Sequence, residues 1–512
     1  MVMTAVFRVD SSIDIGTGHV MRCLAFADEL KTKSINAYFI CRDLPGSIHK
    51  TIRSRGYHVV LLPLQLPYKD IQYSDDYAGW LQVSQAQDSH EFINCLHNLN
   101  ISSNVIIIVD HYALDDVWEN ETKKECNSQI IAIDDLVRPH IADIIIDQTL
   151  GRLESEYKTL CSGGKILTGS DYALIRSSFY EKREFSFDLA MNRNMNIFIT
   201  LGGFDKRNIL SKIICSLQRN PLPWAEKITV ILNSISSNFE FIAEKIKHGS
   251  AQIELVSFVN DMPSFMLNYS IAIGAPGTTT WERAALGIPA ILIPIAENQK
   301  DVAKGYAEKN AGIIIYPEYI NDHLVTAMND LKEDYIQKRD INYLISDGLG
   351  LRRIIQSIWP HKAKDGLDIS LKKATKSDIA IVYTWQCQPT TRRYARNPAI
   401  PSLREHVDWM EAKLTDPTCY FYMIYHGASS VGVIRLDRLG SFCYEVSVFI
   451  DEQKQRINIA KQALKMVAEL HAEIDIVATV LEENIASQSL FHSLNYRKIG
   501  DTTFKLEKRT HG

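Results

Sequence analysis

The stretch Ile15–Arg22, which reads Ile-Gly-Thr-Gly-His-Val-Met-Arg, carries residue types that could do chemistry. It follows an apolar strand predicted at residues 5–9 and opens an amphipathic helix. A strand, a glycine turn and a helix N-terminus form an anion site, so Gly16 and Gly18 are candidates for contacting a phosphate. The helix dipole favours a neutral His19, which could take a proton from water as a general base. The plainer interpretation is a tight turn followed by a capping or packed histidine.

A second glycine turn joins a strand to a helix at Gly274–Glu282. The backbone from Gly277 onward and the hydroxyls of Thr278 and Thr279 could hold a diphosphate, and Glu282 could accept hydrogen bonds from a ribose. A helix with a threonine N-cap and a glutamate in its first turn is the alternative. Two such turns, one in each half of the region, favour a ligand that bridges a cleft.

Polar residues also follow two other apolar strands. His111 and Tyr112 come after one of them, and Asn298 and Gln299 come shortly after the other. The two amides could hydrogen-bond the hydroxyl or acetamido groups of a sugar, and His111 and Tyr112 could line the same cleft. Each of these side chains could equally belong to a solvated loop.

The elements that must position these residues alternate between apolar strands and helices. Continuous apolar strands separated by helices indicate parallel sheets covered on both faces. We therefore predict an α/β fold with two Rossmann-like domains, at residues 1–185 and 186–358, and ligands at the carboxyl edge of each sheet. A polar segment at residues 359–367 is a predicted linker. Alternating strands and a helix then predict a smaller α+β domain at residues 368–508.

Composition narrows the class of protein. The chain has 512 residues, 46% hydrophobic and 23% charged, with a formal net charge of −5. This balance argues against a dedicated nucleic-acid binder, and no polybasic run or long apolar segment predicts a membrane partner. The nine cysteines form no CxxC pair, so we expect reduced thiols, no zinc site and a cytoplasmic protein without a signal peptide.

Residues 4–355 resemble the UDP-sugar hydrolases of pseudaminic acid biosynthesis, which cleave UDP-2,4-diacetamido-2,4,6-trideoxy-β-L-altropyranose. The motifs that carry the resemblance are Arg8–Ser12, Ile15–Leu24, Val109–Tyr112, Ile133–Asp135, Asp171–Arg176, Leu201–Gly203 and Ala296–Gln299. The resemblance implies a GT-B fold, similar to that of nucleotide-sugar glycosyltransferases. It also implies metal-independent hydrolysis at the anomeric carbon, with water in place of a sugar acceptor.

The same resemblance implies roles for individual residues. His19 matches the catalytic histidine, and Asn298 matches an amide of the catalytic site. The resemblance also places four further residues of the matching motifs at the substrate: Asp10, Arg22, Gly202 and Gly203. We expect His19 to activate water while the turn at Gly274–Glu282 stabilises the departing UDP. The alternatives are a glycosyltransferase of the same fold that requires an acceptor, and a nucleotide-sugar-binding protein without activity.

Residues 368–508 resemble the GNAT N-acetyltransferases, which implies acetyl-CoA as the co-substrate. Glu445 is the candidate base, and a solvent-facing strand residue is the alternative. The positions that match the cofactor site are Gln455, Arg456, Asn458, Ala460, Asn484 and Ser487. Asn458 and Asn495 stand where the family has glycine, and Phe491 stands where many members have a tyrosine acid. Because asparagine tolerates positive φ, we expect the turn at Asn458 to be kept.

The pairing of the two regions implies consecutive reactions. In the pseudaminic acid route, a 4-amino UDP-sugar is acetylated immediately before UDP is removed. The resemblance therefore implies a bifunctional enzyme that N-acetylates the 4-amino UDP-sugar and then hydrolyses the product.

Overall fold

The computed structural model describes residues 3–66, 68, 76–99, 101, 104–189, 194–202, 205, 207–249 and 252–509. Contacts divide the chain into a first unit, Met1–Leu351, and a second unit, Arg352–Gly512. The first unit holds two parallel sheets and the second holds a mixed sheet.

The first parallel sheet has the strand order β3-β2-β1-β4-β5-β6-β7, which is Rossmann-like. Its strands are β1 (Thr4–Val9), β2 (Asn36–Arg42), β3 (His58–Leu62), β4 (Val105–Asp110), β5 (Gln129–Ile133), β6 (Ile144–Asp147) and β7 (Lys165–Thr168). The surrounding helices are α1 (Gly18–Thr32), α2 (His49–Ser54), α3 (Tyr77–Trp80), α4 (Gln85–Asn98), α5 (Asp116–Glu125), α6 (Glu154–Tyr157) and the 3₁₀ helix η1 (Ser170–Tyr172). The central strand β4 is buried at every residue, as its continuous apolar sequence predicts.

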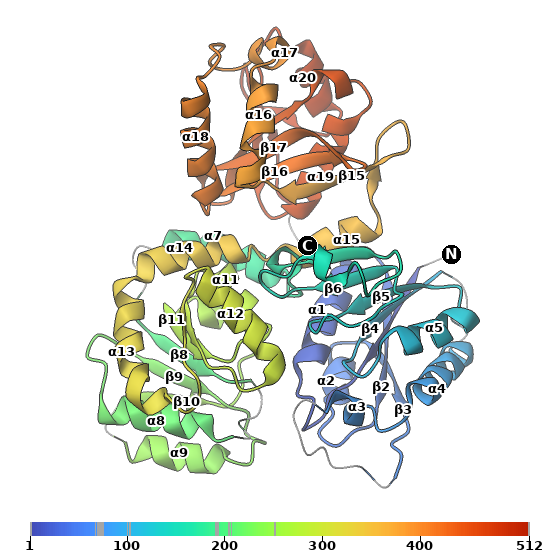
Figure 1. Ribbon diagram of the computed structural model, residues 1–512. Helices are drawn as coiled ribbons and strands as arrows, with labels where there is room; N and C mark the ends of the chain where they lie inside the picture. Colours follow the sequence, from blue (N-terminus) through green and yellow to red (C-terminus); the bar gives the residue numbers. More distant parts are fainter. Residues whose placement is uncertain are drawn as a thin grey trace. The chain divides into compact units, whose positions relative to one another are not determined.

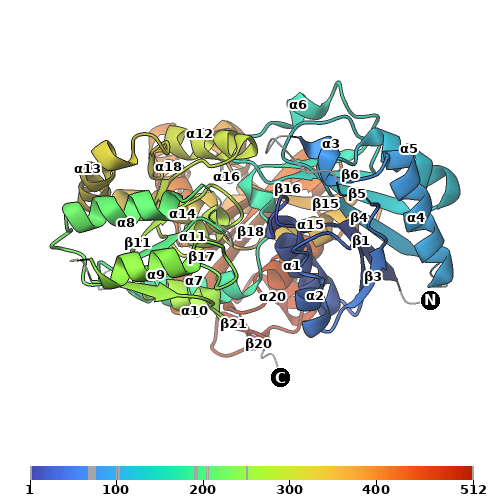
Figure 2. The same ribbon diagram turned by 90° about the horizontal axis from the view of Figure 1, so that it is seen from below.

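Helices cover both faces of this sheet. α1 and α2 lie on one face and α4 and α5 on the other, in the view of Figure 1 and in the turned view of Figure 2. The longest of these helices, α1, has 15 residues. Within the described part of the chain, no helix is long and apolar enough to cross a membrane.

The second parallel sheet has the order β10-β9-β8-β11-β12-β13. Its strands are β8 (Ile197–Thr200), β9 (Ile228–Ile231), β10 (Ile253–Val256), β11 (Ile271–Gly274), β12 (Ala290–Leu292) and β13 (Ile313–Ile314). Its helices are α7 (Ser178–Leu189), α8 (Ile209–Arg219), α9 (Phe239–Lys247), α10 (Met262–Met266), α11 (Thr279–Ala285), η2 (Glu297–Gln299), α12 (Lys300–Glu308), α13 (Ile320–Glu333) and α14 (Tyr335–Ile345). Neighbouring β8 residues enter opposite cores, Ile197 and Ile199 on one face and Phe198 on the other, which confirms a doubly covered sheet.

The boundary predicted between residues 185 and 186 falls inside α7, and this helix packs on the second half. Phe179 of α7 lies in the same buried cluster as Trp281 of α11. The buried guanidinium of Arg183 donates hydrogen bonds to the carbonyls of Ala285, Tyr343 and Ser346 at 2.8–3.0 Å. The sequence pattern missed this because an amphipathic helix does not show which core it covers.

The second unit is built on a sheet with the order β14-β15-β16-β17-β18-β19-β21-β20. Its strands are β14 (His361–Lys362), β15 (Asp368–Lys373), β16 (Cys419–His426), β17 (Ser429–Gly440), β18 (Cys443–Ile450), β19 (Asp475–Thr479), β20 (Arg497–Lys498) and β21 (Thr503–Leu506). Its helices are α16 (Ile379–Gln386), α17 (Pro389–Arg392), α18 (Leu403–Thr415), α19 (Ile459–Leu470) and α20 (Ile485–His492), with η3 (Lys376–Asp378) and η4 (Glu452–Lys454). β18 and β19 are parallel and the other paired strands are antiparallel.

The segment expected to be a linker, residues 359–367, is instead part of this unit. It contains β14, in which His361 pairs with Ile369 of β15. The helix α15 (Gly350–Ile358) before it also contributes, because Gln356 donates to the carbonyl of Met466 at 2.9 Å. A polar composition suggested a linker, but the backbone of a polar segment can still pair at a sheet edge.

Candidate functional site

His19 and Asp110 form the centre of the first site. The parallel register pairs Val9 of β1 with Asp110 of β4, so the loop after β1 begins beside this carboxylate. His19 lies in the first turn of α1, and its Nδ1 is 2.6 Å from Oδ1 of Asp110. This geometry assigns the proton of a neutral imidazole to Nδ1, which leaves Nε2 as an acceptor.

Arg22 keeps Asp110 ionised and links it to Asp135. Its Nε and Nη2 donate to the two oxygens of Asp110 at 2.7 Å, and its Nη1 donates to Asp135 at 2.6 Å. Burial alone would raise the pKa of Asp110, but Arg22 and His19 together hold that pKa far below its usual range. The guanidinium of Arg22 thus organises two carboxylates, and a contact of Arg22 with substrate stays a prediction.

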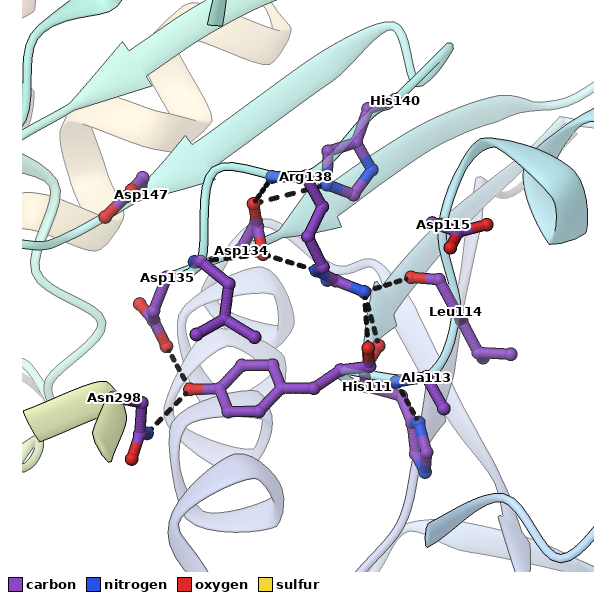
Figure 3. A network of polar contacts seen from close by, with 12 residues as sticks. His111, Ala113, Leu114, Asp115, Asp134, Asp135, Arg138, His140, Asp147 and Asn298 are labelled. Carbon is purple, nitrogen blue, oxygen red and sulfur yellow. Dashed lines mark hydrogen bonds and ion pairs between the residues drawn. The ribbon is translucent and has the colours of Figure 1, made fainter. Parts of the chain in front are cut away.

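Tyr112 connects the two halves of the first unit. Its hydroxyl donates to Oδ2 of Asp135 at 2.7 Å and accepts a hydrogen bond from Nδ2 of Asn298 at 3.2 Å. Figure 3 shows Asp135 and Asn298 converging on this hydroxyl from different halves. Because the amide nitrogen of Asn298 faces Tyr112, its oxygen remains to accept a hydrogen bond from a ligand or water.

An aromatic group surrounds His19 that sequence reasoning missed. The ring of Tyr112 meets the His19 ring edge-on at 4.5 Å, and Trp80 stacks on Tyr112 at 5.5 Å. Tyr77 contacts both Trp80 and Tyr112. Tyr77 and Trp80 belong to the short helix α3, whose sequence has no periodic pattern to mark it. The rings of Tyr112 and Trp80 pack against the imidazole and limit its movement.

Asp10 and His111, both predicted to contact substrate, belong to a buried network instead. The Asp10 carboxylate accepts hydrogen bonds from the Arg8 guanidinium at 2.6 and 2.9 Å and from the backbone N–H of Arg42 at 2.6 Å. His111 Nδ1 accepts from the backbone of Ala113, and its Nε2 lies 3.4 Å from Asp10. Burial lowers the pKa of His111, so this imidazole stays neutral.

The turn before α11 contains the residues predicted to hold a diphosphate. Thr278 occupies the N-cap of α11 and Glu282 lies in its first turn, as the alternative also predicts, but the Thr278 side chain makes no capping bond. Glu282 is half-buried, burial raises its pKa, and within the described residues no protein donor reaches its carboxylate. The hydroxyl of Thr278 and the carboxylate of Glu282 therefore keep hydrogen-bonding capacity for a ligand.

Arg283 lies beneath this turn and was not singled out from the sequence. It is 1% exposed, and it donates to the carbonyl of Ala275 and to Oγ1 of Thr280 at 3.3 and 3.1 Å. Within the described residues its guanidinium forms no ion pair with a carboxylate, and burial lowers its pKa to about 10. A Cβ at Gly274 would lie 2.4 Å from its Nη1, so the glycine makes room for the cation. A buried positive charge behind the turn favours an anionic ligand in front of it.

The remaining predicted residues of this site differ in their conformation and contacts. Gly16 and Gly202 have φ values of +81° and +102°, which only glycine adopts readily. Gly18 has open space where a Cβ would lie, so no packing contact requires a glycine there. Gln299 accepts a hydrogen bond from the backbone of Ile295 at 2.9 Å and stabilises the loop. Gly203 lies outside the described residues.

In the second unit, β18 and β19 separate beside Glu445. Their parallel ladder pairs Cys443–Glu445 with Asp475–Val477, and no further pair between them occurs in the described chain. The following backbone of β18 is therefore available to hydrogen-bond an extended amide-containing ligand. Glu445 accepts a hydrogen bond from Thr479 at 2.7 Å and contacts the guanidinium of Arg396. The alternative of a plain solvent-facing residue does not describe this three-residue cluster.

The turn before α19 contains the residues predicted to bind the pyrophosphate of coenzyme A. Asn458, the N-cap of α19, has φ +74° and makes no side-chain capping bond, which confirms that asparagine keeps the turn. Arg456 also has a positive φ of +68°, and the Gln455 side chain donates to the carbonyl of Ile450. The uncapped N–H groups at the start of the helix, near Ala460, would hold a pyrophosphate.

The later matched positions are structural in part. Asn484 is the N-cap of α20, and its side chain accepts from the backbone N–H of Ser487 at 3.1 Å. Phe491 is buried against Tyr496, with ring centroids 4.9 Å apart. Asn495 has φ +64°, so this position has the left-handed conformation that a glycine, the residue expected here in the GNAT family, adopts readily.

Comparisons with known proteins agree with this architecture. Residues 196–339 match the Glycosyltransferase family 28 C-terminal domain, and residues 368–497 match the Acetyltransferase (GNAT) domain. The chain is therefore an enzyme with a GT-B-like part, which is made of two Rossmann-like halves, followed by a GNAT domain.

The first unit is also similar to a UDP-sugar hydrolase and to other curated proteins. The UDP-2,4-diacetamido-2,4,6-trideoxy-beta-L-altropyranose hydrolase of Campylobacter jejuni is 27% identical over 243 residues, which are 46% of this chain and 72% of that protein. The Spore coat polysaccharide biosynthesis protein SpsG of Bacillus subtilis is 22% identical and covers 67% of this chain and 94% of its own length. Uncharacterized protein MJ1062 of Methanocaldococcus jannaschii is 21% identical, covering 96% of both chains.

Among solved structures, MurG of Acinetobacter baumannii covers 70% of this chain and 99% of its own, with 14% identity and a TM-score of 0.48.

Proposed function

We propose that the first unit hydrolyses UDP-2,4-diacetamido-2,4,6-trideoxy-β-L-altropyranose to UDP and the free sugar, as a step of pseudaminic acid biosynthesis. The observation that carries the proposal is the His19–Asp110 pair beside the Asn298–Tyr112 hydrogen bond. The imidazole of His19 packs against the ring of Tyr112, and the Tyr112 hydroxyl binds the Asn298 amide from the other half, which could hold the sugar. The homology to the hydrolase supports this substrate.

The residues suggest the following reaction. Nε2 of His19 takes a proton from water, and the water oxygen bonds to the anomeric carbon while the bond from that carbon to the phosphate oxygen breaks. Asp110 stabilises the imidazolium that forms. The turn at Gly274–Glu282, with Arg283 behind it, stabilises the charge of the departing UDP.

We further propose that the second unit N-acetylates the 4-amino UDP-sugar precursor with acetyl-CoA. The amine nitrogen bonds to the acetyl carbon, the carbon–sulfur bond breaks, and coenzyme A leaves. Glu445, directly or through a water, receives the proton of the amine. The match to the GNAT domain and the turn at Asn458 support acetyl-CoA as the donor.

The test is incubation of the purified chain with the UDP-sugar alone, followed by mass spectrometry of UDP and free sugar. Release of both without an acceptor supports hydrolysis, and His19→Ala should abolish it. Adding acetyl-CoA and the 4-amino UDP-sugar should yield the UDP-linked diacetamido sugar, and then UDP and the free sugar.

The second candidate is a glycosyltransferase with the same fold, which the match to glycosyltransferase family 28 favours. Strict dependence of UDP release on a sugar acceptor would favour it over hydrolysis. A nucleotide-sugar-binding protein without activity would show tight binding of UDP but no release above background, with or without His19.

A further inference from the structure

Arg396 reaches from the segment between α17 and α18 to the candidate base of the second unit. Its guanidinium contacts Oε1 of Glu445 and donates to Oγ1 of Thr479 at 2.9 Å. The Thr479 hydroxyl donates to the same Glu445 oxygen at 2.7 Å. The side chain of Glu445 is 15% exposed and that of Arg396 is 67% exposed. Arg396 therefore covers the carboxylate while its own surroundings leave it room to turn away.

This arrangement conflicts with acetylation of a simple amine. An amine must give up a proton to the carboxylate, and a guanidinium on that carboxylate repels an incoming ammonium group. The ion pair must therefore open before Glu445 can act. A guanidinium that leaves a carboxylate needs another anion, or it loses its charge-assisted hydrogen bonds.

The other arginines of this segment are engaged elsewhere. Arg392 donates to the carbonyls of Asn397 and Ala399 at 3.3 and 3.2 Å, and Arg393 lies over the ring of Tyr394. Arg396 is thus the cation that the segment presents to Glu445.

The segment is also anchored near the cofactor turn. Gln388 donates to Asp451 at 3.0 Å, and Thr390 donates to Glu452 at 3.3 Å. These bonds hold the start of the segment against the chain just before the turn at Asn458, so Arg396 projects from a fixed base.

We propose that Arg396 is the acceptor-specificity residue of the acetyltransferase domain, and that it selects amines carrying a phosphate or diphosphate group. A phosphate of the acceptor replaces Glu445 as the partner of the guanidinium, whose planar fork suits two parallel hydrogen bonds to phosphate oxygens. Glu445 is then uncovered to take the proton of the amine. The inference rests on the acetyltransferase part of the proposed function and is independent of the hydrolase part.

The experiment uses the full chain carrying His19→Ala, so that the UDP-linked sugar is not consumed. Acetyl transfer from acetyl-CoA is measured with the UDP-4-amino-sugar and with the same amino sugar lacking UDP. We expect kcat/KM to favour the UDP-linked acceptor by about 10-fold or more. Arg396→Ala should remove this preference, mainly by raising KM for the UDP-linked acceptor, without slowing transfer to the free amino sugar. Arg396→Lys should restore part of it.

The matched control is Arg404→Ala in α18, since the side chain of Arg404 is 92% exposed and lies 3.9 Å from Asp408. This control should leave both acceptors unaffected. An unchanged preference in Arg396→Ala, or an equal loss with both acceptors, would overturn the inference and leave the acetyltransferase proposal standing. No transfer to either acceptor by the chain with Arg396 intact would overturn both.

Discussion

Nδ1 of His19 lies 2.6 Å from Oδ1 of Asp110, and the two residues are 91 positions apart in the chain. The carboxylate also receives two hydrogen bonds from Arg22 at 2.7 Å. Asp110 thus both orients the imidazole and stays ionised, which are the conditions for a histidine that accepts a proton at Nε2.

Asp110→Asn should therefore reduce UDP release strongly. An asparagine amide can donate to Nδ1 and move the imidazole proton to Nε2, where it blocks proton acceptance. We expect kcat to fall by roughly 10²–10⁴-fold, measured by UDP release. His97→Ala, at an exposed position of α4, serves as the control. Wild-type turnover in Asp110→Asn would show that His19 is not the base.

Tyr112 and Asn298 should be energetically coupled. Tyr112→Phe keeps the ring contact with His19 but removes the hydrogen bonds to Asp135 and Asn298. In a double-mutant cycle with Asn298→Ala, we expect a coupling energy of about 0.5–3 kcal/mol in kcat/KM. Strictly additive effects would mean that the hydrogen bond between the halves does not matter for turnover.

Arg283→Gln should weaken binding of UDP, because it removes the buried positive charge behind the turn before α11. We expect Kd to rise by roughly 10-fold, as measured by calorimetry, and Arg283→Lys to keep part of the affinity. Arg219→Gln, at an exposed site of α8, should leave Kd unchanged.

The effect of a substitution at Asn458 on stability should depend on how well the new residue tolerates a positive φ. With φ at +74°, Asn458→Val should destabilise the second unit by about 1–2 kcal/mol, whereas Asn458→Gly should be neutral or stabilising. Thermal unfolding and acetyl-CoA binding of the full chain measure the two effects. If Asn458→Val bound acetyl-CoA as tightly as the wild-type chain does, this turn would not be the pyrophosphate site.

His140 should make the first half less stable at alkaline pH. Burial alone would lower its pKa, but the carboxylates of Asp134 and Glu119 outweigh burial and raise the pKa to about 9. The folded pKa lies above the usual 6.5, so this stabilisation is complete below about pH 6.5 and is lost as the pH rises to 9, by about 3 kcal/mol in all. Hydrogen exchange of α5 and β6 across this range measures it. His140→Gln should remove this dependence of stability on pH. If stability fell with pH equally steeply in His140→Gln, His140 would not be the cause.

The sequence alone predicted much of the fold. Runs such as Val105–Asp110 identify buried parallel strands because a strand covered on both faces needs apolar residues at every position. The motifs at Ile15–Arg22 and Gly274–Glu282 predicted both turns, because glycine turns and helix N-termini can be identified from short stretches of sequence. The sequence did not show that α7 packs on the second half or that residues 361–362 pair at a sheet edge, since helix amphipathicity and polarity do not reveal which core or sheet edge a segment joins.

Only the tertiary structure decided which ionisable side chains lie within hydrogen-bond distance of one another. Asp10, Arg22 and His111 carry the residue types of a ligand site, and the fold buries all three beside charged or polar partners. Arg283 and Arg396 looked like ordinary helix and loop arginines, and only folding places one behind the turn before α11 and the other on Glu445. The residue types and local elements follow from short stretches of sequence, whereas the role of each ionisable group depends on partners that strand register and loop path bring within hydrogen-bond distance.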